Sequence, residues 1–284
     1  MTIKNFIPTI WSARLLANLD KKLVYGNVVN RDYEGEISGL GDRVKINQIG
    51  PIAIKDYLTG DGAAKKLADP EEVTSTQREL VIDKAKYFNF KVDDIDAAQA
   101  NVGLVDKAMD RASYAIGDVI DQHIASFVKD AGVEVGSSTT PIDVDIANAY
   151  DQLVDLAVAL DENNVTRAGR FAIIPAWYLG MLSKDPRFTK DFKVLENGVI
   201  DGADVAGFNL RMSNNVPVTA KKYSILAGTE QAISYAGQIT NIEPYRPEKT
   251  FADAVKGLFV YGTKVVEPKA LANFTCQIKV EAEA

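Results

Sequence analysis

Few residues of this chain have side chains that commonly carry out chemistry, and those few lie far apart in the sequence. The 284 residues include one cysteine, Cys276, and one histidine, His123. A single cysteine forms no internal disulfide, and no Cys-x-x-Cys pair is present to hold zinc. With one histidine as well, the usual ligands of transition metals are nearly absent. We expect His123 to be a packed, hydrogen-bonded residue and Cys276 to be a small buried apolar one.

Two short stretches match ligand-binding motifs only in part. The segment Gly60-Asp61-Gly62 with Lys65 lacks the spacing of a phosphate-binding loop and is expected to be a solvated loop tip. Asp93, Asp94 and Asp96 lack the glycine and distal glutamate of a calcium loop. No Gly-x-Ser-x-Gly or His-Glu-x-x-His motif occurs, and nothing singles out a catalytic pair among the 39 carboxylates. We expect no catalytic residue, no cofactor site and no metal site.

The composition is that of a globular protein of one or two domains. Hydrophobic residues make up 46% and charged residues 25% of the chain, and the net charge is −7. The excess of acid argues against a dedicated nucleic-acid binder, which would carry a basic stripe. No apolar run approaches the roughly 20 residues that span a bilayer, and residues 1–24 lack the continuous apolar stretch of a signal peptide. We expect no membrane partner and synthesis inside the cell.

The elements that would position functional residues begin with a short amphipathic helix after Pro8. Trp11, Leu15, Leu19 and Leu23 recur at four-residue spacing and form a narrow apolar stripe. Two interpretations remain open for this stripe. It either packs on the core of its own chain or forms an arm that lies on a neighbouring subunit.

Two runs then have strand character, residues 43–49 and residues 80–93. In the second run, apolar and polar side chains alternate between the two faces of a strand. The polar stretch 59–72 lies between the runs, so we expect a long two-stranded hairpin with a polar tip. Arms of about 15 residues would reach roughly 50 Å, and so long a hairpin needs a surface to lie on, such as another subunit. Phe88, Phe90 and Val92 fall on one face of this strand, and Tyr87, Asn89 and Lys91 fall on the other face.

A long helix is predicted for residues 104–130, with a length of roughly 40 Å. Its aspartates, including Asp118 and Asp121, lie largely off the apolar stripe. Residues 141–244 alternate helix and strand signals and form an α/β unit, and the chain ends in further strands. The predicted apolar stripe of the helix is Val105, Met109, Ala112, Ile116, Val119, His123 and Phe127.

In both order and sequence these parts resemble the major capsid (coat) protein of tailed bacteriophages, which has the Hong Kong 97 fold. The resemblance covers nearly the whole chain and is closest to the branch that assembles with a separate scaffolding protein. The matching stretches are IPTIWSARLLANLDKKLVYGNVVNRDYEGEI (7–37), GDRVKIN (41–47), IDKAKYFNFKVDDIDAAQAN (82–101), YSILAG with TEQAISYAGQI (223–239), and YRPEKTFADAVKGLFVYGTKVVEPKALA (245–272).

The resemblance implies an α+β fold with four named parts. Residues 1–35 would be an N-terminal arm and 36–100 an extended β-hairpin loop. Residues 101–140 and 245–284 would form a peripheral domain with a long spine helix, and 141–244 an α/β axial domain. The arm motif begins within ten residues of Met1, so a separate scaffolding protein is expected.

The resemblance also implies a structural function without enzyme activity or cofactors. The chain would form hexamers and pentamers of an icosahedral head, with scaffolding and portal proteins and decoration or head-completion proteins as further partners. The head would enclose double-stranded DNA without binding it specifically. It would be assembled in the cytoplasm of a bacterial host and would form the shell of the virion. The alternatives are an encapsulin-like compartment shell or, from a different class, a small-molecule enzyme built on residues 141–244.

Contacts between subunits are expected at two places. The first is the apolar stripe of the arm. The second is the hairpin tip, where charges of both signs follow one another closely and can form ion pairs with an adjacent subunit. The candidate contact residues are Trp11, Leu15, Leu19, Lys65, Lys66, Asp69, Glu71 and Glu72.

Overall fold

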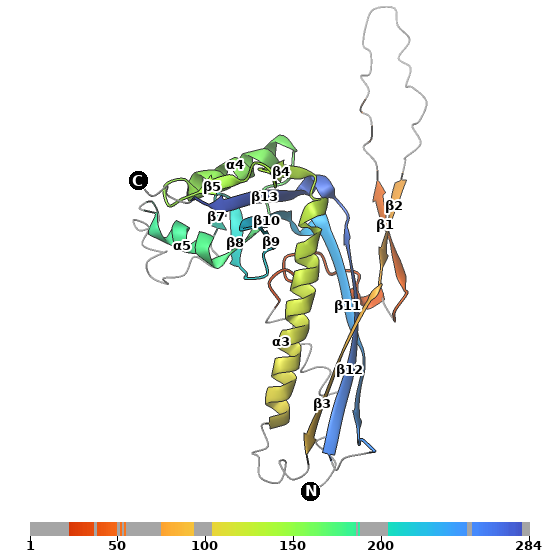
Figure 1. Ribbon diagram of the computed structural model, residues 1–284. Helices are drawn as coiled ribbons and strands as arrows, with labels where there is room; N and C mark the ends of the chain where they lie inside the picture. The colour runs from red at the N-terminus through yellow and green to blue at the C-terminus, as the bar shows by residue number, and fades with distance from the viewer. Residues whose placement is uncertain are drawn as a thin grey trace, which may run out of the picture.

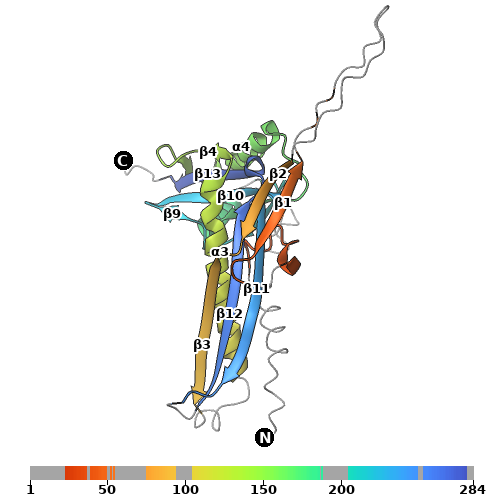
Figure 2. The same cartoon turned by 90° about the vertical axis from the view of Figure 1, so that its right-hand side faces the viewer.

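The computed structural model describes residues 23–36, 39–49, 52, 54, 75–93, 104–185, 187, 204–248 and 252–279. A block made of helices and a large sheet lies at one end of the molecule (Figure 1). A long helix and a sheet of long strands extend from this block side by side, and a separate two-stranded ribbon lies next to the long strands (Figures 1 and 2). Within the described part of the chain, no helix is both long and apolar enough to cross a bilayer.

An eight-stranded sheet forms the centre of the block. The strand β6 (Arg170–Ile174) is buried along its whole length, as expected for the apolar run FAII in a central position. The helices α4 (Ala149–Glu162) and α5 (Ala176–Lys184) pack beside the sheet, and the Tyr178 hydroxyl on α5 donates a 2.8 Å hydrogen bond to the carbonyl of Ala149 on α4. The path through the sheet is β4 (Val133–Val135), β13 (Leu271–Ile278), β10 (Lys222–Thr229), β6, β8 (Phe208–Met212) and β7 (Asp204–Val205), with β5 (Ile142–Val144) on β13 and β9 (Val218–Thr219) on β10.

Three long antiparallel strands form the second sheet, in the order β11 (Ile233–Tyr245), β12 (Ala252–Val265) and β3 (Lys84–Asp93). Phe88 and Phe90 are half-buried and pack against the main core, whereas Tyr87, Asn89 and Lys91 are exposed. The alternation predicted for these residues is therefore confirmed.

The long helix is α3 (Leu104–Ala125), and it continues as the 3-10 helix η3 (Ser126–Asp130). Its most buried face lies next to the predicted stripe, and of the stripe residues whose side chains are described, Met109 and Ile116 belong to this face. Asp121, predicted to lie off the apolar side, is buried with 2% of its surface exposed. That prediction was wrong because the carboxylate has backbone partners from another part of the chain. Among the described side chains of α3 and η3, the buried ones are Met109, Ser113, Ile116, Ile120, Asp121, Ile124, Ala125 and Val128.

The predicted hairpin exists, but its second arm differs from the prediction. The strand β1 (Arg43–Ile49) pairs with β2 (Ser75–Val81) in an antiparallel register that runs from Arg43 opposite Val81 to Ile49 opposite Ser75. Residues 80–93 are not one strand, because the chain leaves β2 at Ile82 and enters the long sheet as β3. Ile82 exchanges backbone hydrogen bonds with Gly41 and Asp42, which closes the base of the hairpin.

A small core fixes this hairpin to the long sheet. Arg78 on β2 donates a hydrogen bond to the carbonyl of Val265 on β12, at 3.1 Å. The hairpin is therefore attached to the body by apolar packing and by hydrogen bonds at its base. The buried residues of this core are Val44, Ile46, Leu80, Ile82, Ala236, Val260 and Val266.

The two sheets exchange strands across the expected domain limits. Most of β11 comes from the stretch 141–244, which the resemblance assigns to the axial domain, yet it pairs with β12. The strand β13 comes from 245–284 and pairs with β10 in the eight-stranded sheet. Because the chain crosses between the sheets in both directions, their buried side chains form one continuous core. Short 3-10 turns at η2 (Glu34–Glu36), η4 (Glu230–Ala232) and η5 (Pro268–Ala270) connect these parts.

Candidate assembly surfaces and the arm anchor

The two residues with the most versatile side-chain chemistry are both packed into the structure. The half-buried ring of His123 makes edge contacts with Phe127 and Tyr261, each with ring centroids 5.2 Å apart. Partial burial, together with the positive charge of nearby Lys84, lowers the pKa of His123. Cys276 is fully buried, as predicted, and burial raises the pKa of its thiol to about 12. At neutral pH the thiol is therefore protonated and a poor nucleophile.

The residues that the structure describes contain no group of three or more His, Cys, Asp or Glu side chains arranged to hold a metal ion. The partial motifs at 60–65 and at Asp94 and Asp96 lie outside the described residues. The same holds for all eight candidate contact residues, namely Trp11, Leu15, Leu19, Lys65, Lys66, Asp69, Glu71 and Glu72.

The carboxylate of Asp121 forms a site that sequence reasoning missed. It accepts backbone N–H hydrogen bonds from Val24 at 2.8 Å, Tyr25 at 3.0 Å and Gly26 at 3.2 Å. Three consecutive amides of one segment therefore converge on one side chain of α3. The local signal in the sequence that could have indicated a buried Asp121 is its position between the apolar residues Ile120 and Ile124. The structure shows that both isoleucines are completely buried.

Residues 23–30, which we call the arm root, are tied to the body along their whole length. Leu23 and Tyr25 are buried against the main core, and so are Val28 and Val29. At the far end, the N–H of Asn30 donates to carbonyl oxygens of η4 and β11, and its own carbonyl accepts a hydrogen bond from Tyr235 at 2.8 Å. The segment in which the sequence predicts an arm therefore joins the body at a stretch that is largely buried and is hydrogen-bonded to the body.

Several large apolar side chains of the body are exposed. Tyr87 on β3 is 80% exposed and stands opposite Leu258 of β12 in the strand register. On the same sheet, the hydroxyl of Tyr245 hydrogen-bonds with the side chain of Asn89. Tyr114, which is 63% exposed, lies on α3. Exposed aromatic and aliphatic groups on a sheet are typical of surfaces that contact another protein chain.

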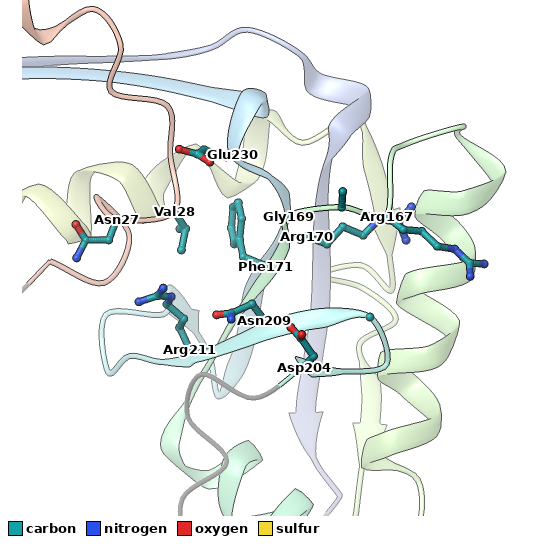
Figure 3. A pocket seen from close by; sticks show the side chains of 12 residues that line it. Asn27, Val28, Arg167, Gly169, Arg170, Phe171, Asp204, Asn209, Arg211 and Glu230 are labelled. Atoms are coloured by element: carbon teal, nitrogen blue, oxygen red, sulfur yellow. The ribbon is translucent and has the colours of Figure 1, made fainter.

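A cavity of about 530 Å³ lies between the arm root, β6 and the β7–β8 ribbon (Figure 3). Phe171 and Arg211 are among its lining residues, and the carboxylates of Asp204 and Glu230 lie on opposite sides of it (Figure 3). Its described lining contains no serine, cysteine or histidine, and its two carboxylates do not face each other as a catalytic pair would. The side chains of Arg167 and Arg170 point away from its centre, toward α4 (Figure 3).

Arg170 is the buried cation of this region, with 2% of its side chain exposed. Its guanidinium donates to Asp161 at 2.7 Å and to the backbone carbonyls of Thr166, Val165 and Ala157. Arg167 also pairs with Asp161, at 2.5 Å, but its side chain is 81% exposed. Arg170 therefore ties the end of α4 to the loop that leads into β6.

Solved structures show which class of protein this architecture defines. A chain of Mycobacterium phage Che8 is 28% identical with a TM-score of 0.71, and the match covers 89% of this chain and 90% of that one. The capsid of Ralstonia phage GP4 is 11% identical with a TM-score of 0.67, covering 90% and 88%. A virus-like particle from Pyrococcus furiosus has the same fold at 14% identity, with a TM-score of 0.57 and coverage of 94% and 98%. The fold is the Hong Kong 97 type used by shell-forming proteins, as the sequence resemblance implied.

The family follows from the sequence itself. The profile of the family described as phage capsid protein matches residues 76–274, and the chain belongs to this family. Together with the structural similarity, this makes it a structural major capsid protein of a tailed-phage head and favours that role over a compartment shell. No curated protein matches the sequence.

Proposed function

We propose that this capsid protein acts without enzymatic activity and forms the hexamers and pentamers of an icosahedral shell around double-stranded DNA. The main support is the family match over residues 76–274 together with the 89% and 90% mutual coverage with the Mycobacterium phage Che8 chain. The net charge of −7 is consistent with a shell that encloses DNA, because it limits tight binding of that DNA.

We further propose that a separate scaffolding protein directs assembly in the cytoplasm of the host. A portal protein and decoration or head-completion proteins would join the same shell. In this proposal the arm (1–35) and the extended loop (36–100) reach neighbouring subunits from bases that pack on the body of their own chain. The peripheral domain (101–140 and 245–284) and the axial domain (141–244) form the body. Two observations support this division. The arm root attaches the N-terminal arm to the body, and the small core at the base of the β1–β2 hairpin attaches the extended loop to the body.

Deletion of residues 1–22 tests the role of the arm, because it leaves the arm root and its contacts in place. We expect the full-length chain, co-expressed with its scaffolding protein, to form closed particles tens of nanometres across. The truncated chain should melt at nearly the same temperature but form few closed particles. Negative-stain microscopy and light scattering measure assembly, and calorimetry measures folding. Normal shells from the truncated chain would exclude an essential role for the arm, whereas full-length chain that stays monomeric throughout would contradict assembly itself.

Charge reversal tests the hairpin tip. With both Lys65→Glu and Lys66→Glu, we expect weaker assembly that is more sensitive to salt and little change in the melting of the subunit. Each exposed ion pair contributes only about 0–1 kcal/mol and is screened by salt, but a shell repeats the contact at every subunit. Light scattering at a series of salt concentrations is the measurement. The matched control is Lys65→Arg with Lys66→Arg, which keeps the charge, and equal assembly of both variants would show that the tip makes no charge contacts.

A further inference from the structure

The helix α4 has two apolar faces, and only one of them packs on the core. The second face is an outer stripe that runs at four-residue spacing from the turn before the helix along its exposed side. Within this stripe Val154 is 36% and Val158 is 47% exposed. Valine is a weak helix former, so helix stability does not account for these two residues on an outer face. The buried face is Ala149, Leu153, Leu156 and Leu160, and the outer stripe is Ile146, Tyr150, Val154 and Val158.

Acidic side chains border the open part of the outer stripe. Arg187 covers the beginning of the stripe, where its guanidinium lies 4.7 Å from the centre of the Tyr150 ring. Farther along the helix, Asp155 and Glu162 are exposed, and no lysine or arginine in the described part of the chain forms an ion pair with either of them. The outer face of α4 is therefore an apolar surface with a negative border.

The hairpin of β9 and β10 has the complementary character. Its turn residues Ala220 and Lys221 both have positive φ angles, 52° and 66°, as in the tight two-residue turns that join antiparallel strands. Beside the turn, Val218 is 50% exposed. Lys221 is exposed, and Lys222 donates to the carbonyl of Ser138 at 2.5 Å; among the described residues neither lysine pairs with a carboxylate. The hairpin thus presents an apolar side chain next to two positive charges.

We propose that the β9–β10 hairpin of one subunit docks on the outer face of α4 of the next subunit around a ring. Val218 lies on the outer stripe in this contact, and Lys221 faces the acidic border formed by Asp155 and Glu162. The occupant is a second copy of this chain, because its hairpin matches the α4 surface in both apolar character and charge.

The positions of the two surfaces fit a ring. Both views place α4 and β9 at different sides of the block, so the two surfaces of one chain do not meet each other (Figures 1 and 2). A contact between two different surfaces is heterologous, and its repetition generates a ring when the rotation closes. This contact rests on the proposed hexamers and pentamers, in which it would join neighbouring subunits.

The double substitution Val154→Gln with Val158→Gln tests the outer stripe. Glutamine is a better helix former than valine, so the unassembled subunit should melt at the same temperature or slightly higher. The yield of closed particles, measured by sedimentation and negative-stain microscopy after co-expression with the scaffolding protein, should fall roughly tenfold because apolar burial is lost at every interface. Normal particle yield would overturn the proposal, and a clearly lower melting temperature would assign the stripe to folding and overturn it too.

An exchange of charges tests which surfaces meet. Lys221→Glu alone should lower the particle yield roughly tenfold, since it places like charges opposite each other at every interface. Combining it with Asp155→Lys or with Glu162→Lys should restore most of the yield in at least one of the two combinations. The matched control is Lys221→Glu with Asp130→Lys, which keeps the net charge of −7 but alters an exposed aspartate at the end of η3. This control should not restore assembly.

The outcomes separate this contact from the proposed shell. Normal assembly of Lys221→Glu would overturn the contact while leaving the shell intact. Failure of both acidic combinations to restore assembly, or equal restoration by the Asp130→Lys control, would overturn it as well. Wild-type chain that forms no particles would instead refute the proposed assembly, and the contact with it.

Discussion

Arg170→Met is expected to lower the free energy of unfolding by about 3–5 kcal/mol, a large part of the 5–15 kcal/mol that stabilises a typical domain. Arg170 is almost fully buried and supplies hydrogen bonds to three backbone carbonyls as well as to Asp161. Methionine fills a similar volume but donates no hydrogen bond, so buried carbonyl oxygens lose their partners. Chemical denaturation of the unassembled chain measures the effect, and we expect the loss of particles to follow.

The matched control for Arg170→Met is Arg167→Met. Arg167 pairs with the same carboxylate, Asp161, but its side chain is 81% exposed. Its removal should leave the unfolding transition almost unchanged, because exposed ion pairs contribute little to stability. If the two variants were equally stable, the stabilising role of the buried arginine would be refuted.

Gly262→Ala is expected to destabilise the chain by about 1–3 kcal/mol and to loosen the base of the β1–β2 hairpin. A Cβ atom at this position of β12 would overlap the carbonyl oxygen of Val81 and approach the Cα of Ile82 within 3.1 Å. These are backbone atoms of the segment that leads from β2 to β3, so they cannot move aside as a flexible side chain can. Thermal unfolding gives the loss of stability, and hydrogen exchange of residues 75–82 shows whether the hairpin separates from the sheet.

Gly180→Ala provides the opposite case. Gly180 lies within α5, where an added Cβ would meet no atom within 4 Å. Alanine favours the helix by about 0.5–1 kcal/mol relative to glycine, so this variant should be at least as stable as the wild type. If Gly262→Ala and Gly180→Ala melted at similar temperatures, the close backbone contact at Gly262 would not be required to hold the β2–β3 segment against β12.

Elements with a strong local pattern were predictable from the sequence. The alternation from Tyr87 to Lys91 predicts the strand and its two faces. The predicted apolar stripe of α3 is displaced by one residue from the face that is buried. Two overlapping sets of apolar residues have helical spacing in this segment. Only the packing partners of the helix decide between the set containing Val119 and His123 and the set containing Ile120 and Ile124.

The features that the sequence did not predict depend on distant contacts. Ile82 ends β2 because its backbone bonds to Gly41 and Asp42, and the continuous strand-like pattern across it carries no sign of this break. Asp121 is buried because it binds backbone amides about 95 residues away in the sequence. Nearly every residue type has a backbone amide, so the residue types of the arm root do not indicate this contact. The separation of β13 from β12 into different sheets also depends on pairings with β10 and β4.

The burial of Cys276 makes the chain suitable for site-directed thiol labelling. Cys276 is the only cysteine, and its inaccessible, protonated thiol will not react with maleimides while the chain is folded. A second cysteine introduced on the surface, for example by Tyr87→Cys, would therefore be the single reactive position on each subunit. Pairs of such variants, mixed and oxidised, form disulfides only where two Cα atoms lie within about 7 Å. The neighbours of each exposed face in the assembled shell can thus be mapped chemically without first removing a native thiol.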